Sequence, residues 1–340
     1  MPKKLITDTV NNIFNHINKF TPMKFSVQLI IILFIFGSCK KETEQTPDPG
    51  SNSENYSSIN NFFIRNSPAM QTYTVSGSAG GTITTAKGTS INIPSNAFVN
   101  PANNIIETGT ITIRFKDFYK KSDMLLANVP TTMANGFPLR SGGDFFIKAE
   151  NANGIVLDLA PGVGIDVNQP FPGPFPLPLD TTMQAFVGAR DSLNGMTWVQ
   201  TFSNQVSTLA GTYVYSMYQF NSPLDSGSWC NSDDPTFFSG FPLTTLNIST
   251  DSIDQYQTQV FLLFSGINSM IHVYEDYLSN AFIYTYAPVG FNCTIVAIGE
   301  RNGDLYSAFE PVTISNGTFA NVTLSKTTTD EFKARLDSLN

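Results

Sequence analysis

The chain has 340 residues, of which 14% are charged and 12% are aromatic, and its formal net charge is −8. This composition supplies enough apolar surface for a folded core, whereas disordered chains are highly charged and poor in aromatic residues. The acidic excess argues against nucleic acid or anionic lipid as the main partner, because clustered Lys and Arg bind both. The length allows one large or two medium domains.

Residues 1–38 have the features of a leader that ends in a lipoprotein signal peptide. Lys24 precedes an apolar run that is too short to span a membrane, and the small pair Gly37–Ser38 stands directly before Cys39. The pattern resembles the lipobox of bacterial lipoproteins, with Phe36 where leucine is usual. We therefore expect lipid on Cys39, the membrane as a partner through this anchor, and a place at the outer membrane, on the cell surface or the periplasmic face. An ordinary secretory signal or a signal anchor is the alternative.

Two methionines could start this leader. Met23 lies directly before the cation and the apolar run, whereas a start at Met1 gives an unusually long leader, so we expect translation to begin at Met23. Removal of the first 38 residues, which hold four Lys and one Asp, leaves 15 basic and 26 acidic residues, a net charge of about −11.

Residues 39–66 are polar and contain Pro47, Pro49 and a cluster of Ser and Asn, which predicts a lipidated, flexible tether. From residue 67 onwards, apolar residues alternate with polar ones, as they do in β-strands with one buried face. Two longer apolar runs, Val260–Phe264 and Ile295–Ile298, predict central strands that are buried on both faces. Tight hairpin turns are predicted at the Asn-Gly pairs Asn135-Gly136, Asn153-Gly154, Asn194-Gly195, Asn302-Gly303 and Asn316-Gly317.

Helix is predicted at few positions. Thr328 and Glu331 have the spacing of a capping box at the start of a C-terminal helix. Three apolar residues then form one stripe that we expect to dock on the body: Phe332, Leu336 and Leu339. A short helical turn is predicted to begin at Ser122. We therefore predict an all-β protein with two packed β-sandwich domains, residues 67–223 and 224–340, and a short C-terminal helix.

Glycine and isoleucine positions between residues 80 and 113 resemble a known domain. The segments 80–84, 88–98 and 110–113 are similar to the β-sandwich domain shared by zonula-occludens proteins, netrin receptors and ankyrins. Segments 121–124, 130–132 and 141–147 resemble bacterial lipoproteins that are built on this domain, in which an apolar residue takes the place of Asp144. Residues 282–324 resemble a transthyretin-like or carboxypeptidase-regulatory-like sandwich. The resemblance implies interaction modules or spacers and no catalytic activity.

A search of the sequence for catalytic residues is mostly negative. One of the two histidines, His16, lies in the leader, and the other, His272, lies in an apolar alternation typical of a strand. We expect no metal and no cofactor. The acidic segment 231–235 has oxygen ligands that suit calcium but no known calcium-loop spacing, so an Asx-rich turn is expected there. Glycoside hydrolysis needs only two carboxylates, and four are candidates: Asp144, Glu150, Glu275 and Asp276.

Two cysteines follow Cys39 in a compartment that permits disulfides. Cys230 and Cys293 either form a bridge or are two separately buried thiols, and the sequence leaves both readings open. Four aromatic residues are candidates for ligand binding, with core packing as the alternative: Tyr213, Tyr215, Tyr218 and Trp229.

These features favour a lipid-anchored cell-envelope protein that is not an enzyme. We expect it to act as a binding or scaffolding module for a protein or glycan ligand and to bind no nucleic acid. A carboxylate-based glycan hydrolase and a passive structural spacer are the alternatives.

Overall fold

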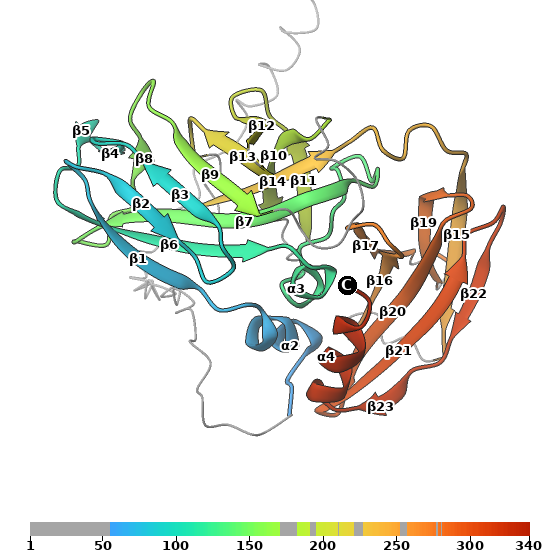
Figure 1. The fold of residues 1–340 in the computed structure, drawn as a ribbon. Coiled ribbons are helices and arrows are strands. Elements are labelled where there is room, and N and C mark those ends of the chain that lie inside the picture. Colours follow the sequence, from blue (N-terminus) through green and yellow to red (C-terminus); the bar gives the residue numbers. More distant parts are fainter. Residues whose placement is uncertain are drawn as a thin grey trace, which may run out of the picture. The chain divides into compact units, whose positions relative to one another are not determined.

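Strands make up most of the folded part of the protein. The computed structural model describes residues 55–170, 182–190, 195–209, 211–220, 227–251, 257–276, 278–279 and 281–340. Within these ranges the strands form two β-sandwiches and the helices are short (Figure 1). The predicted all-β fold class is therefore confirmed. Among the described residues, no helix has the length and apolar character needed to cross a membrane.

The first sandwich consists of two sheets whose inner faces share one hydrophobic core. Sheet 1 has the strand order β1 (Gln71–Ser76), β6 (Thr110–Phe118), β7 (Arg140–Asn151), β14 (Ser228–Asp234), β10 (Gln184–Arg190) and β11 (Met196–Gln200). Sheet 2 has the order β12 (Gln205–Leu209), β13 (Thr212–Met217), β9 (Ile165–Pro170), β3 (Ser90–Ile93) and β2 (Gly81–Thr84). A further small sheet consists of β5 (Ile105–Ile106), β4 (Phe98–Asn100) and β8 (Asp158–Leu159).

The second sandwich is built in the same way around a core of its own. Sheet 3 has the order β17 (Met270–Val273), β16 (Thr258–Phe264), β20 (Asn292–Arg301), β21 (Asp304–Thr313) and β23 (Ser325–Thr327). Sheet 4 has the order β18 (Glu275–Asp276), β19 (Ala281–Pro288), β15 (Leu243–Thr250) and β22 (Phe319–Val322).

Strand β14 departs from the predicted domain boundary after residue 223. It lies between β7 and β10 in sheet 1, where Asn231 is opposite Asp144 and Cys230 is opposite Val187. The sheet pairing therefore places residues 228–234 with the first sandwich. Alternation of apolar residues identifies a strand but not its partners, so a strand that returns to the centre of an earlier sheet is invisible to that signal.

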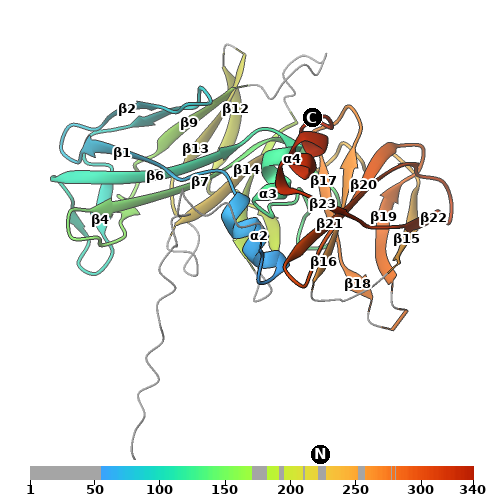
Figure 2. The ribbon, with the colours of Figure 1, turned by 90° about the horizontal axis from the view of Figure 1, so that it is seen from below.

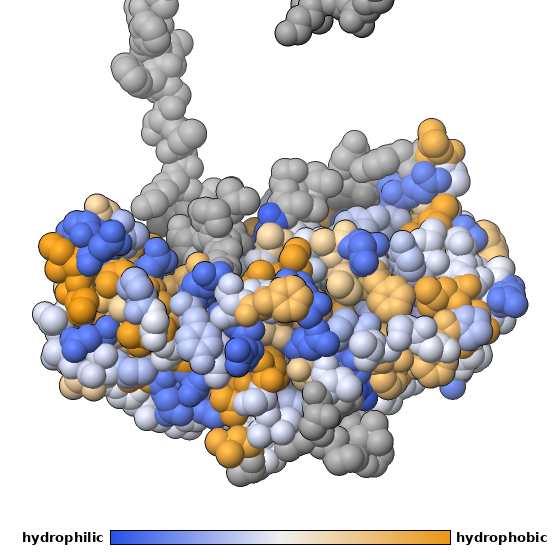
Figure 3. Space-filling model, turned by 90° about the horizontal axis from the view of Figure 1, so that it is seen from above, coloured by the Kyte–Doolittle hydropathy of each residue, from blue (hydrophilic) through white to orange (hydrophobic). Residues whose placement is uncertain are grey.

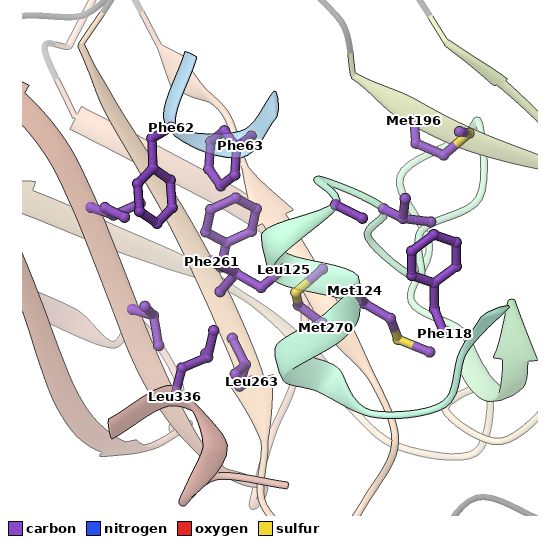
Figure 4. Close-up of a cluster of buried hydrophobic side chains, with 14 of the residues drawn as sticks. Phe62, Phe63, Phe118, Met124, Leu125, Met196, Phe261, Leu263, Met270 and Leu336 are labelled. Carbon is purple, nitrogen blue, oxygen red and sulfur yellow. The ribbon is translucent and has the colours of Figure 1, made fainter. Parts of the chain in front are cut away.

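Sheets 1 and 3 are buried on both faces. Neighbouring residues of a strand point to opposite faces, so they belong to different cores. Phe145 belongs to the core of the first sandwich, whereas Phe146 faces away from it. Leu262 likewise belongs to the core of the second sandwich and Leu263 faces away. The side chains that face away meet in a third cluster, the junction core, which also takes side chains from three helices (Figure 4). Double burial was predicted for β16 and β20, and it is confirmed.

The three helices are α2 (Ile59–Asn66), α3 (Lys121–Leu126) and α4 (Thr329–Asp337). In two views at right angles they lie between the sandwiches (Figure 2). The C-terminal helix has the predicted capping box, since Thr328 accepts a hydrogen bond from the Glu331 backbone and the Glu331 side chain accepts one from the Thr328 backbone. Phe332 and Leu336 of this helix are buried in the junction core, as predicted.

Helix α2 corrects the predicted tether. Residues 55–66 were expected to be part of a flexible linker, but Ile59, Phe62 and Phe63 are buried in the junction core. Their spacing of three and four residues is that of one helix face, and Ser58 caps the helix by accepting a hydrogen bond from Asn61 N. The polar composition of the preceding segment conceals this short amphipathic pattern.

Only one of the described Asn-Gly pairs has the backbone of the expected turn. Asn302 and Gly303 have φ angles of 53° and 87°, and they connect β20 to β21 as a type I′ turn does. At Asn135-Gly136, Asn153-Gly154 and Asn316-Gly317, positive φ occurs at the glycine alone. Asn194 lies outside the described residues.

Substitution of Phe62 by alanine tests whether α2 is part of the fold. The side chain is completely buried and its ring lies 5.6 Å from that of Phe332. We expect Phe62→Ala to lower the free energy of unfolding by about 3–5 kcal/mol, because it leaves a cavity in the junction core. Ile64 is 58% exposed on the same helix, so Ile64→Ala should change stability by less than about 1 kcal/mol. Equal effects of the two substitutions in urea unfolding would contradict a docked α2.

Candidate functional site

Most of the aromatic residues that the sequence offers for ligand binding lie inside the protein. Tyr213 and Tyr215 on β13 are buried, and the Tyr215 hydroxyl donates a hydrogen bond of 3.0 Å to the Phe186 carbonyl. Trp229 on β14 is 8% exposed and belongs to the junction core. Tyr218 alone of the four is exposed. The structure thus assigns Tyr213, Tyr215 and Trp229 to packing, because the strands that hold them are covered on the faces where these rings lie.

Cys230 and Cys293 are both free thiols. Cys230 lies in the core of the first sandwich and Cys293 in the core of the second. Burial raises the pKa of the Cys230 thiol, and it raises the pKa of Cys293 to about 12. The possible disulfide is therefore replaced by two separately buried thiols that are weak nucleophiles. Cys39, the predicted lipidation site, lies outside the described residues.

The four carboxylates considered for glycoside hydrolysis lie on two strands. Asp144 and Glu150 are six residues apart on β7, a separation of roughly 20 Å along an extended strand. Glu150 forms an ion pair of 2.8 Å with Arg114; burial opposes ionisation, but hydrogen bonds from Lys148 and Arg114 lower its pKa. Glu275 and Asp276 are neighbours on β18 and point to opposite faces of that strand. Neither the two carboxylates on β7 nor the two on β18 therefore face each other across a space for a sugar, as glycoside hydrolysis requires.

His272 lies on β17 and is 8% exposed. Its ring stacks on Phe261 of β16 with the centroids 4.8 Å apart, and the Tyr274 ring, directly after β17, lies 4.4 Å away. These contacts are those of a packed strand histidine, as the sequence predicts.

A group of partly exposed aromatic residues, which sequence reasoning missed, lies on the second sandwich. The Phe241 ring is 42% exposed and packs edge-on against Phe291 with the centroids 4.7 Å apart. Phe237 contacts both rings, at 6.4 Å from each. We call these three residues the aromatic surface. The pair Phe237-Phe238 and Phe241, in a short segment with Gly, Pro and Ser, was the available signal.

Charged residues hold one side of the aromatic surface in place. The guanidinium of Arg140 lies 4.3 Å from the centre of the Phe237 ring and pairs with Asp234 at 2.9 Å. Burial would raise the pKa of Asp234, but hydrogen bonds from Thr236 and Arg140 outweigh it and lower the pKa. The Arg140 cation over the ring, itself paired with Asp234, holds Phe237 in place three residues after the end of β14.

Exposed apolar residues also occur elsewhere. On the face drawn in Figure 3 they form several separate groups and no continuous stripe. The most exposed large apolar side chains include Leu278, Phe202, Ile105, Leu209 and Phe319. Single exposed apolar residues are normal on soluble domains, so the aromatic surface is distinguished by its ring-to-ring contacts and not by exposure alone.

Comparisons with protein-family models, with curated proteins and with solved structures found no match. The sequence resemblances described above therefore stay predictions.

The two free thiols have a direct chemical test. In denaturant without a reductant, we expect the mature chain to react with two equivalents of a maleimide, at Cys230 and Cys293. In the native protein both should react far more slowly, because neither thiol is exposed and their raised pKa values leave little thiolate at neutral pH. Labelling that appears in denaturant only after reduction would show a disulfide.

Proposed function

We propose that this protein is a lipid-anchored component of the cell envelope that binds a protein or glycan ligand without catalysing a reaction. The aromatic surface is the observation that carries the binding role. Aromatic side chains are enriched where proteins meet their partners, since a rigid ring buries a large area at a small entropic cost. Of the carboxylates considered for hydrolysis, Asp144 and Glu150 lie far apart on β7, and Glu275 and Asp276 point to opposite faces of β18.

The anchor supports the same proposal from the other end of the chain. The lipobox-like sequence at Cys39 predicts two or three acyl chains, which hold a protein on a membrane stably, since each buried methylene adds about 0.8 kcal/mol. Helix α2 begins at Ile59, twenty residues after this cysteine. The first helix after the proposed attachment point is thus part of the junction core.

Substitution of Cys39 tests the anchor. We expect Cys39→Ser to leave an uncleaved precursor that keeps its apolar leader and does not incorporate labelled palmitate. Cys230→Ser is the matched control, because it removes a thiol that is buried in the first sandwich. Palmitate incorporation by the Cys39→Ser variant would refute the anchor.

Photo-crosslinking from Phe241 tests the binding role. With a benzophenone amino acid at this position in living cells, we expect an adduct of defined size after illumination. A protein ligand would give an adduct that proteases shorten, and a glycan ligand one that glycosidases shorten.

The control position is Phe319, which is 60% exposed on β22 and does not belong to the aromatic surface. No adduct at Phe241, or the same adducts at both positions, would contradict a ligand at the aromatic surface and would favour a passive spacer.

A further inference from the structure

Four polar side chains meet where β7 and β14 pair. Asn231 lies opposite Asp144, and Asp233 lies opposite Ser141, with a bulge between the two pairs. The Ser141 hydroxyl lies 3.2 Å from Asp144 Oδ1 and 3.0 Å from Asn231 Oδ1. The Asn231 side-chain amide donates to Asp233 Oδ2 at 2.5 Å. Residues that lie 87 positions apart in the chain therefore share one polar cluster.

This cluster faces the junction core and not the interior of the first sandwich. Phe118 on β6 is opposite Asp144, and Phe186 on β10 is opposite Asn231. Residues directly opposite each other in antiparallel strands point to the same face. Both phenylalanines belong to the junction core, so the polar cluster is inserted in the apolar layer between the two sandwiches.

Asp144 and Asp233, which we call the acidic pair, are completely buried. Each carboxylate has one oxygen that accepts a hydrogen bond from within the cluster and one that does not. Asp144 Oδ2 and Asp233 Oδ1 have no hydrogen-bond partner among the described residues. A buried acceptor without a partner is costly, and here two of them lie in one cluster.

The other buried carboxylates of the first sandwich differ from the acidic pair in having cations beside them. Asp117 accepts hydrogen bonds from two threonine hydroxyls and lies 3.9 Å from Lys87 Nζ. Asp234 pairs with Arg140 at 2.9 Å. The hydrogen bonds described for the acidic pair come from a hydroxyl and an amide, which are neutral groups.

Two buried carboxylates side by side require a positive charge or protons. One shared proton removes only one of the two negative charges, so one negative charge stays buried. A divalent cation neutralises both charges and takes both free oxygens as ligands.

We propose that the acidic pair binds one calcium ion, with Asp144 Oδ2 and Asp233 Oδ1 as ligands and the side-chain oxygen of Asn231 as a third. Carboxylate and amide oxygens are the ligands that calcium takes in proteins, and water supplies further ones. Within the described ranges, no three His, Cys, Asp or Glu side chains gather to hold a metal. The proposed site therefore differs from such groups in using two carboxylates and one amide oxygen. Segment 231–235 was expected to be an Asx-rich turn, but residues 228–234 are a strand.

The position of the site gives the ion a structural role. The Ser141 backbone amide donates to the Asn268 carbonyl at 2.8 Å, and the Asn268 side chain donates to the Ser141 carbonyl at 3.1 Å. Asn268 lies between β16 and β17 of the second sandwich, so these two hydrogen bonds connect Ser141 of the first sandwich to the second. An ion bound beside Ser141 stabilises the contact between the sandwiches. This role is independent of the ligand proposed for the aromatic surface.

Calcium titration of the full chain, purified in detergent and stripped with a chelator, tests the site. At pH 7 we expect one calcium ion per chain by isothermal titration calorimetry and a rise of several degrees in the melting temperature. No bound calcium at concentrations up to about 1 mM, with an unchanged melting temperature, would overturn the proposal, because that range covers weak extracellular calcium sites.

Neutral variants locate the ion. Asp144→Asn and Asp233→Asn should each weaken calcium binding at least about tenfold, because each removes a charged ligand. Glu150→Gln is the matched control, since Glu150 lies on the same strand and pairs with Arg114; it should leave calcium affinity unchanged. Calcium binding of wild-type strength in both Asn variants would overturn the site. If the Asn variants do not fold, the wild-type titration decides alone.

Discussion

The junction core is the constraint on which the rest of the structure depends. A sandwich of two sheets normally buries one face of each sheet and leaves the other face to solvent. Here sheets 1 and 3 carry apolar side chains on both faces, so neither sandwich can expose its inner sheet to water. Packing the two sheets toward each other, with α2, α3 and α4 filling the space between, buries both extra faces at once.

The same constraint explains why the fold class was readable from the sequence and the binding residues were not. The runs Val260–Phe264 and Ile295–Ile298 are apolar at every position, which predicts strands buried on both faces. Tyr215 and Trp229 are residue types that often bind ligands. Only the side chains that pack around them in the structure show that their rings are buried. Exposure of an aromatic ring on a strand depends on what packs on that strand, and a single sequence does not contain this information.

Local patterns were predicted well, and contacts between distant segments were not. The capping box at Thr328 lies within four residues and was found, whereas the amphipathic pattern of α2 was hidden by the polar residues before it. The sequence singles out Asp144 as a candidate for hydrolysis and Asp233 as part of an acidic turn, but it does not indicate that the two residues meet. Their meeting depends on the return of β14 to the middle of sheet 1, a pairing that leaves no mark on the local sequence.

The contact between α2 and α4 joins segments from opposite ends of the described fold. Tyr56 and Thr329 share a hydrogen bond of 2.7 Å across 273 residues of chain, and Phe62 packs on Phe332. Contacts of such long range form slowly, because the loop between them must close first. The strands of the first sandwich all lie before residue 235, whereas the junction core also requires Phe332 and Leu336 of α4. Until α4 docks, Phe62 lacks its ring contact with Phe332, whereas Phe63 also packs on Phe261 of β16 with the centroids 6.1 Å apart.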